Sequence, residues 1–315
     1  MTNPVSRSRE TKAPHARRIA ITGSSGLIGS ALVRALESRG DAVLHVVRRA
    51  ARDANELSWN PETGAIEAAK LNGVDAVVNL AGENLAQRWT DSAKRRIYDS
   101  RVKGTALLAR TIAALDRQPS VLLSASAVGI YGDRADVVLD ESSGSGTGFL
   151  ADVCRAWEGA TSVASNAGIR VAHLRTGLVL AGSGGLLEKM LMPFRFGVGG
   201  KLGSGRQWMS WVALDDHVSA MVFLLDAALS GAVDLTAPNP VTNSEFTKVL
   251  AHVLGRPSFV TVPRFALELA MGEMARETAL VSQRAMPKRL LEAGFTFQQP
   301  SIEGALRSVL TRSAR

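Results

Sequence analysis

The stretch ITGSSGLIGSALVRALESRG, residues 21–40, decides the fold. It continues an apolar run, RRIAIT (17–22), turns through Gly23, Gly26 and Gly29, and goes on as an amphipathic helical pattern. A turn of this kind brings backbone N–H groups and the positive end of the helix dipole toward a phosphate. The stretch therefore predicts a dinucleotide site at the start of a strand–helix–strand unit.

Short apolar runs alternate with longer helical patterns through the first 180 residues. Such alternation is typical of a parallel sheet with helices on both faces. The segment ELSWNPETGAI (56–66) interrupts it and indicates a hairpin. The fold class expected is α/β, with a Rossmann-like doubly wound parallel sheet. The predicted strands are 17–22, 40–49, 74–82, 119–126 and 168–177, and the predicted helices between them include 89–115 and 148–166.

From about residue 181 glycine-rich stretches replace this alternation. AGSGG (181–185) and FGVGGKLGSGRQW (196–208) are typical of mobile loops above a sheet rather than of further strands. A smaller, mostly helical C-terminal lobe is expected beyond them. Its helical patterns lie at 215–229, 243–255 and 266–294, the last broken by Pro287.

The formal net charge of +8 does not indicate a nucleic-acid partner. Half of the excess lies before or at the first strand, and the remainder is interspersed with acids. No basic stripe with interleaved aromatic residues is present, so nucleic-acid binding is not expected. The basic residues near the start are Arg7, Arg9, Lys12, Arg17 and Arg18, against the single acid Glu10.

Targeting, membrane and metal signals are lacking in the sequence. Residues 1–16 are polar, and no apolar run is long enough to span a bilayer, so a cytoplasmic protein without a membrane partner is expected. The single cysteine, Cys154, cannot form an intramolecular disulfide. No metal site is expected either, because the five histidines are scattered without paired spacing. A monomer or homodimer acting on a small molecule is the expected form.

The second predicted strand ends in Arg48 and Arg49. In dinucleotide sites an acid at this point hydrogen-bonds the 2′-hydroxyl of NAD, whereas a guanidinium suits the 2′-phosphate of NADP. The sequence therefore favours NADP over NAD as cofactor, with Arg48 meeting the phosphate. Solvated charge at the end of a strand is the alternative interpretation.

Several motifs together resemble one protein family. The order of TGSSGLIG (22–29), NLAG (79–82), SASAVGIYGD (124–133) and LRTG (174–177) is similar to that in the extended short-chain dehydrogenase/reductases, the sugar-nucleotide epimerase group. Further stretches resemble an atypical, epimerase-like family with a C-terminal domain of unknown function. These stretches are RWTDSAKRRIYDSRVKGT (88–105), FLADVCRAWE (149–158), SWVALDDH (210–217) and QRAMPKRLLEAGF (283–295).

The resemblance covers about residues 18–310 and implies an NAD(P)-binding Rossmann domain with a substrate cleft under the lobe. The expected division is a disordered basic tail at 1–16, a Rossmann domain at 17–180 to which 205–238 returns, and a smaller lobe at 181–204 and 239–315. The expected cofactor-binding residues are Gly23, Ser24, Ser25, Gly26, Leu27, Ile28, Gly29, Arg48, Leu80, Ala81, Gly82, Arg101, Ser124 and Thr176.

The catalytic pair that the resemblance implies is missing. The superfamily pairs a serine with Tyr-x-x-x-Lys, and Ser126 matches the serine. The tyrosine falls on Phe149 or Leu150 and the lysine on Val153 or Cys154, depending on a register choice of one residue. The remaining candidates for proton transfer are Tyr131 and Glu83, with Ser126 polarising a carbonyl. Cys154 is either a reactive thiol or a buried inert one.

A second departure is Arg101, which stands where related enzymes have asparagine. It interrupts an apolar helical stripe formed by Ile97, Thr105, Leu108 and Ile112. Burial of an unpaired guanidinium is costly, so Arg101 is expected to face an anion in the cleft, on the cofactor or the substrate. Snorkelling to solvent is the alternative.

Other residues are expected to have recognition or structural roles. Asn84, Gln87 and Arg88 are candidates for substrate recognition. Asp215 and Asp216 are expected to cap a helix that begins at residue 217. Trp59 is expected to pack on the sheet edge, with contact to the adenine as the alternative.

Two functional classes therefore follow. The favoured one is an NADP-dependent oxidoreductase or nucleotide-sugar-epimerase-like enzyme with rearranged acid/base groups, acting on an unidentified small molecule, an anionic one if Arg101 faces it. The alternative is a non-catalytic NADP(H)-binding sensor or scaffold.

Overall fold

The computed structural model describes residues 16–312. The expected basic tail, apart from residue 16, lies outside the described residues. No helix within this range combines the length and hydrophobicity that a bilayer crossing requires. The described residues also contain no cluster of three or more His, Cys, Asp or Glu side chains that could hold a metal ion.

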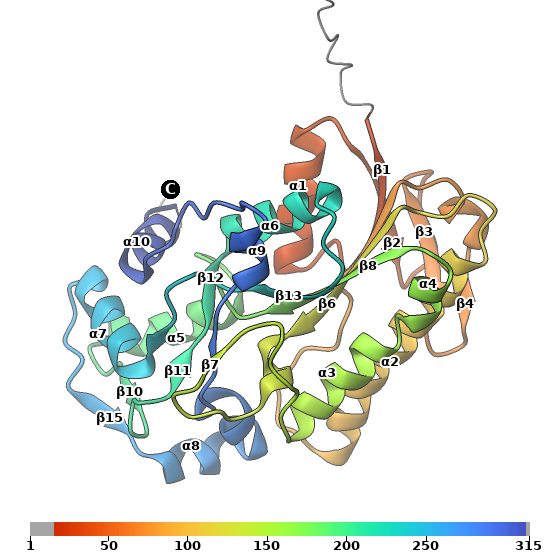
Figure 1. Ribbon diagram of the computed structural model, residues 1–315. Coiled ribbons are helices and arrows are strands. Elements are labelled where there is room, and N and C mark those ends of the chain that lie inside the picture. Colours follow the sequence, from red (N-terminus) through yellow and green to blue (C-terminus); the bar gives the residue numbers. More distant parts are fainter. Residues whose placement is uncertain (1–15, 313–315) are drawn as a thin grey trace, which may run out of the picture.

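An eight-stranded sheet forms the centre of the molecule (Figure 1). All its neighbouring strands are parallel except the last pair, β3 and β4, which form the predicted hairpin. The sheet therefore has the α/β architecture expected from the alternating pattern. Its strand order is β13 (Gly231–Leu235), β8 (Arg170–Thr176), β6 (Val121–Ala127), β5 (Ala76–Asn79), β1 (Arg18–Thr22), β2 (Ala42–Val47), β3 (Glu56–Asn60) and β4 (Ala65–Ile66).

Helices cover both faces, because successive residues of the central strands point to opposite faces and are buried on both. Ile19 and Ile21 of β1 join the core with α1 (Leu27–Ser38) and α6 (Leu214–Asp226). Ala20 between them faces the core with α2 (Asp91–Ala113) and α4 (Ser162–Asn166).

The single helix expected at 148–166 is two helices. α3 (Phe149–Gly159) ends at Ala160, and α4 starts after Thr161. Thr161 donates its hydroxyl hydrogen to the carbonyl of Glu158 at 2.7 Å. This bond stabilises the corner between the two helices.

The C-terminal lobe has its own core of Leu187, Phe194, Phe246 and Leu306, among others. Its helices are α5 (Gly185–Arg195), α7 (Asn243–Leu254), α8 (Arg264–Met271) and α10 (Ile302–Arg312). Helix α9 (Lys288–Glu292) packs instead on β13, and its Leu290 joins the core of α1 and α6. Short strand pairs join the lobe to the main body: β9 (Leu178–Leu180) with β12 (Trp211–Ala213), β11 (Trp208–Met209) with β14 (Val241–Thr242), and β7 (Val138–Leu139) with β16 (Arg284–Ala285).

Two expectations for this lobe are wrong. The glycine-rich stretch 196–208 contains a strand, β10 (Gly200–Leu202), whose partner is β15 (Val260–Val262). The pattern at 266–294 does not form helices throughout, because a π-helical turn, η3 (Ala275–Ala279), and strand β16 lie between α8 and α9. Pairing with distant strands places β10 and β16 in extended conformation, which the local patterns did not indicate.

Candidate functional site

The glycine turn after β1 packs tightly on the loop after β5. Gly23 has a φ of +69°, and a Cβ there would lie 2.9 Å from the carbonyl carbon of Leu80. A Cβ at Gly29 would overlap the carbonyl oxygen of Gly23. The glycines thus hold the start of α1 close to both loops, and no side chain caps this helix start. The first-turn N–H groups of α1 are therefore available to a phosphate.

Two buried polar residues that the sequence analysis did not single out hold this arrangement. Thr22 donates to Asn79 Oδ1 at 2.7 Å and accepts from the backbone N–H groups of Leu80 and Ala81 at 3.0 and 3.1 Å. Asn79 donates in turn to Thr105 of α2 at 2.7 Å. The signal that could have identified them is the presence of polar residues at the carboxyl ends of otherwise apolar strands.

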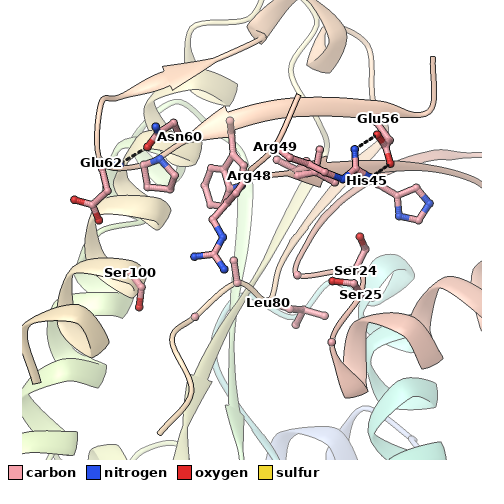
Figure 2. A pocket seen from close by; sticks show the side chains of 18 residues that line it. Ser24, Ser25, His45, Arg48, Arg49, Glu56, Asn60, Glu62, Leu80 and Ser100 are labelled. Carbon is pink, nitrogen blue, oxygen red and sulfur yellow. Dashed lines mark hydrogen bonds and ion pairs between the residues drawn. The ribbon is translucent and has the colours of Figure 1, made fainter. Parts of the chain in front are cut away.

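A pocket of about 1030 Å³ opens beside the turn (Figure 2). Its walls include expected cofactor residues from the turn, from the end of β2 and from the loop after β5: Gly23, Ser24, Ser25, Gly26, Arg48, Leu80, Ala81 and Gly82. The β3–β4 hairpin and its neighbours supply lining residues that were not predicted: His45, Glu56, Asn60, Pro61 and Glu62.

The two arginines after β2 have different surroundings. Arg49 forms a two-pronged ion pair with Glu56, in which Nη1 lies 2.6 Å from Oε2. These hydrogen bonds lower the pKa of Glu56 to about 2. Arg48 instead extends its guanidinium into the pocket (Figure 2). Of the pair, Arg48 is therefore the residue placed to meet an anionic ligand.

Trp59 belongs mainly to the core. It is 2% exposed and packs against α2, where a Cβ on Gly104 would lie 3.2 Å from its ring. The expected packing on the sheet edge is thus what the structure has. The same residue also lines the pocket.

Arg101 is buried, at 9% exposure, rather than snorkelling to solvent. Its Nη1 donates to the carbonyl oxygens of Glu83 and Ile97 at 3.1 and 3.2 Å. Its guanidinium carbon lies 5.1 Å from the ring centre of Trp157 on α3. Burial lowers the pKa of Arg101, but a guanidinium of this kind stays charged at neutral pH. A desolvated cation therefore stands behind Gly82 in the pocket wall.

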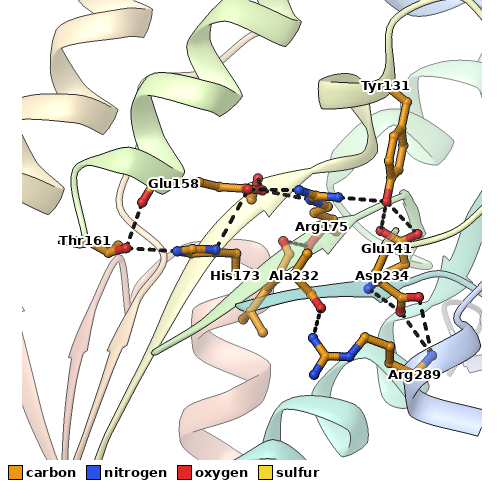
Figure 3. A network of polar contacts seen from close by, with 12 residues as sticks. Tyr131, Glu141, Glu158, Thr161, His173, Arg175, Ala232, Asp234 and Arg289 are labelled. Carbon is orange, nitrogen blue, oxygen red and sulfur yellow. Dashed lines mark hydrogen bonds and ion pairs between the residues drawn. The ribbon is translucent and has the colours of Figure 1, made fainter. Parts of the chain in front are cut away.

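Two other expected catalytic residues, Ser126 and Tyr131, belong to a buried polar network (Figure 3). Ser126 donates to Glu158 at 2.7 Å, and Glu158 is held by Nε and Nη2 of Arg175 at 2.9 and 3.0 Å. The Tyr131 hydroxyl lies 2.8 and 2.9 Å from the carboxylate oxygens of Asp234 and accepts from Arg175 Nη1 at 3.0 Å.

Tyr131 does not fit the expected role of proton donor in the cleft. Its side chain is 0% exposed, and burial together with the charge of Asp234 raises its pKa well above the ordinary value. The expectation for Ser126 is weakened in the same way, because its hydroxyl hydrogen is directed to Glu158. The apolar motif around these residues gave no indication of the acids, Glu158 and Asp234, that reach them.

Helix α3 carries neither the tyrosine nor the lysine of the catalytic pair, and the residues at those positions have other contacts. Phe149 packs edge-on against Trp89 at 5.1 Å, and the backbone N–H of Leu150 donates to Glu277. Cys154 is 3% exposed, and burial raises its pKa to about 11. These observations fit the inert, buried thiol rather than a nucleophile.

The capping role expected of Asp216 does not agree with the structure. Its carboxylate accepts from the backbone N–H groups of Gln298 and Gln299, both at 2.8 Å, so it holds the segment before α10. Helix α6 starts at Leu214 rather than at residue 217, so Asp215 lies in its first turn. The carboxylate of Glu83 contacts the Gln87 amide at 3.2 Å and Arg96 at 3.7 Å, and its role in proton transfer stays a prediction.

The remaining expected cofactor residues lie apart from the pocket lining. Leu27, Ile28 and Gly29 form the first turn of α1. Ser124 is 1% exposed, and its Oγ has no hydrogen-bond partner among residues 16–312. Thr176 contacts the carbonyl of Leu174 and Nε2 of the buried His217.

Comparison with known proteins agrees with this geometry. Residues 19–234 match the model of the NAD dependent epimerase/dehydratase family, and residues 262–309 match a domain of unknown function, DUF1731. The chain is 46% identical to epimerase family protein ML0860 of Mycobacterium leprae over 94% of its own length and 97% of that protein. It is 36% identical to YfhF of Bacillus subtilis over 93% and 97% of the two lengths.

Solved structures give the same result. The human epimerase family protein SDR39U1, crystallised with NADPH, superposes with a TM-score of 0.87 at 30% identity, covering 93% of this chain and 99% of that one. A nucleoside-diphosphate sugar epimerase from Corynebacterium glutamicum superposes with a TM-score of 0.78 at 40% identity, covering 94% of this chain and 58% of that one. This chain belongs to the NAD dependent epimerase/dehydratase family, among the members that carry the C-terminal domain of unknown function.

Proposed function

We propose that this chain binds NADP(H) and exchanges hydride between it and a small molecule. The observation that carries the proposal is the unequal surroundings of the two arginines after β2. Glu56 neutralises Arg49, whereas Arg48 keeps its charge directed into the pocket. A guanidinium in that position suits the 2′-phosphate that distinguishes NADP from NAD.

The pocket also fits the rest of such a cofactor. Gly23 and Gly29 let the turn pack closely on the loop after β5 and on the start of α1, and the uncapped start of α1 offers backbone N–H groups to a pyrophosphate. The human relative crystallised with NADPH supports the same assignment. When bound, a nicotinamide supplies or accepts a hydride, while the chain provides position and charge.

The test is titration calorimetry with NADPH and NADH on the wild type and Arg48→Ala. A charge-assisted hydrogen bond is worth about 1.5–3 kcal/mol, so the wild type should prefer NADPH by roughly tenfold or more. Arg48→Ala should lose most of that preference and leave NADH binding nearly unchanged. Arg34→Ala, an exposed arginine on α1, is the matched control. Equal affinities in the wild type would overturn the proposal.

The acid/base chemistry decides between turnover and sensing. Burial of Tyr131 and engagement of Ser126 by Glu158 favour a second candidate, a protein that binds NADP(H) without turning over a substrate. Positioned acid/base groups contribute on the order of 10²–10⁴ in rate, so ordinary sugar nucleotides should be turned over poorly. A screen of carbonyl compounds, read by NADPH oxidation, separates the two. A substrate establishes the enzyme, whereas tight NADPH binding without any substrate favours the sensor.

A further inference from the structure

A buried positive charge lies at the far half of the site. A dinucleotide extends across the carboxyl edge of such a sheet, with its halves on either side of the turn after β1. Arg48, after β2, marks the adenosine half. The other half must lie over the ends of β5 and β6. Arg101 lies beside Gly82, which follows β5, and over Trp157 of α3, the helix that packs beside β6.

No acid neutralises Arg101 at close range in the described part of the chain. Glu83 contributes its carbonyl oxygen to Arg101, but its carboxylate contacts Gln87 and Arg96. Glu158 is held by Arg175 and Ser126. The Cys154 thiol stays protonated at neutral pH, because burial raises its pKa to about 11. The guanidinium thus forms no ion pair within residues 16–312, although the charge of Glu83 acts on it from a greater distance.

The guanidinium also has donors to spare. It carries five N–H donors, and both of its hydrogen bonds leave from Nη1. On the pocket side it is covered by Gly82, where a Cβ would lie only 3.1 Å from the guanidinium carbon. A glycine at this position leaves the thinnest possible wall between the charge and the cofactor pocket.

We propose that Arg101 makes this site bind NADPH more tightly than NADP⁺ and so favours occupancy by the reduced cofactor. This inference rests on the proposed function. The nicotinamide ring is neutral in NADPH and carries one positive charge in NADP⁺, so a cation nearby repels only the oxidised form. The 2′-phosphate and pyrophosphate are common to both forms and cancel in the comparison. At an effective dielectric constant of about 20, two unit charges about 12 Å apart repel by an energy that corresponds to roughly tenfold in relative affinity.

The experiment measures the dissociation constants of NADPH, NADP⁺ and 2′,5′-ADP by calorimetry. The variants are Arg101→Met, Arg101→Gln and Arg101→Lys, with Arg110→Met, an exposed residue further along α2, as the charge-matched control. The wild-type ratio of the NADP⁺ to the NADPH constant should be roughly ten. It should fall toward one in the two neutral variants and persist in Arg101→Lys and Arg110→Met. The fragment 2′,5′-ADP lacks the nicotinamide, so its affinity should not change.

The outcomes separate the two proposals. A wild-type ratio at or below one overturns the inference without any variant, even if the neutral variants fail to fold. A high ratio that survives in a folded neutral variant also overturns it. In either case, weakening of 2′,5′-ADP by Arg48→Ala would leave the proposed function standing. Failure of the wild type to prefer NADPH over NADH would instead overturn the proposed function.

Discussion

Two arginine–glutamate pairs, one at the rim of the pocket and one in the interior of the protein, have different effects on their neighbours. Arg49 and Glu56 pair at the rim of the pocket, where the arginine side chain is 42% exposed. Arg175 and Glu158 make the same two-pronged contact in the interior, where the arginine side chain is 10% exposed. The first pair leaves Arg48 free to bind a ligand. The second engages Ser126 and Tyr131, the residues in which catalysis was expected.

The difference separates residues that remain available to a ligand from residues that are engaged within the protein. The pocket around Arg48 uses exposed side chains and backbone, which remain available to a ligand. The residues around Arg175 form a buried network that connects β6, β8 and β13 with α3 (Figure 3). We therefore expect substitution of Arg48 to alter binding and substitutions of the network residues to alter stability.

The largest effect should follow Arg175→Met. Removing one partner of a buried ion pair costs about 3–5 kcal/mol, because Glu158 would remain buried without its counter-charge. Urea unfolding of the variant and the wild type measures this loss. Arg155→Met, which removes an exposed pair with Asp152, should cost less than about 1 kcal/mol and serves as control. Equal losses in the two variants would mean that the buried Arg175–Glu158 pair contributes no more to stability than an exposed pair does.

A smaller, pH-dependent effect is expected at His217. Burial lowers the pKa of this residue from 6.5 to about 4, so the folded protein resists its protonation. The unfolded chain binds the proton below pH 6.5, and stability is therefore lost as the pH falls from 6.5 toward 4. The loss should reach about 3 kcal/mol at pH 4.

The variant His217→Gln removes the titrating group. Glutamine retains a group able to bond Thr176, which lies 3.0 Å from Nε2 of the imidazole. The free energy of unfolding of the wild type should therefore fall relative to that of the variant as the pH is lowered in steps through this range. Other acids titrate in both proteins and cancel in the difference. Parallel stability curves would show that His217 accepts a proton in the folded state as readily as in the unfolded one.

The sequence predicted the pocket residues around Arg48 better than the contacts of Tyr131 and Ser126, for a physical reason. The glycine turn and Arg48 act through local backbone geometry and a strand end, which short patterns reveal. The partners of Tyr131 and Ser126 come from distant elements: Asp234 is 103 residues beyond Tyr131, and Glu158 is 32 residues beyond Ser126. Local spacing carries no information about such contacts. The same limit explains β10, whose strand partner β15 lies in the other part of the lobe.

The cap predicted at Asp216 failed for a related reason. Asp216 has the residue type of a cap, but it lies within the first turn of α6, and its carboxylate accepts N–H groups from residues 298 and 299. The same acceptor chemistry serves a local helix end or a distant loop equally well. Periodicity, by contrast, correctly placed Arg101 on a buried stripe, because burial along a helix repeats at a fixed spacing.

The smallest effect should come from Tyr131→Phe, which tests most directly whether the buried network around Arg175 is structural. The substitution keeps the ring and removes one hydroxyl, so Asp234 loses a donor and Arg175 loses an acceptor. A buried hydrogen bond of this kind is worth about 1–2 kcal/mol, and that loss should appear in urea unfolding. NADPH affinity should stay within about twofold of wild type, because no cofactor-pocket residue changes. Any NADPH oxidation found in the carbonyl screen should persist, because a hydroxyl held between a carboxylate and a guanidinium is not a free proton donor. A large loss in the rate of NADPH oxidation at an unchanged free energy of unfolding would restore Tyr131 as the catalytic acid. It would also overturn the division between a ligand-binding pocket and a structural network.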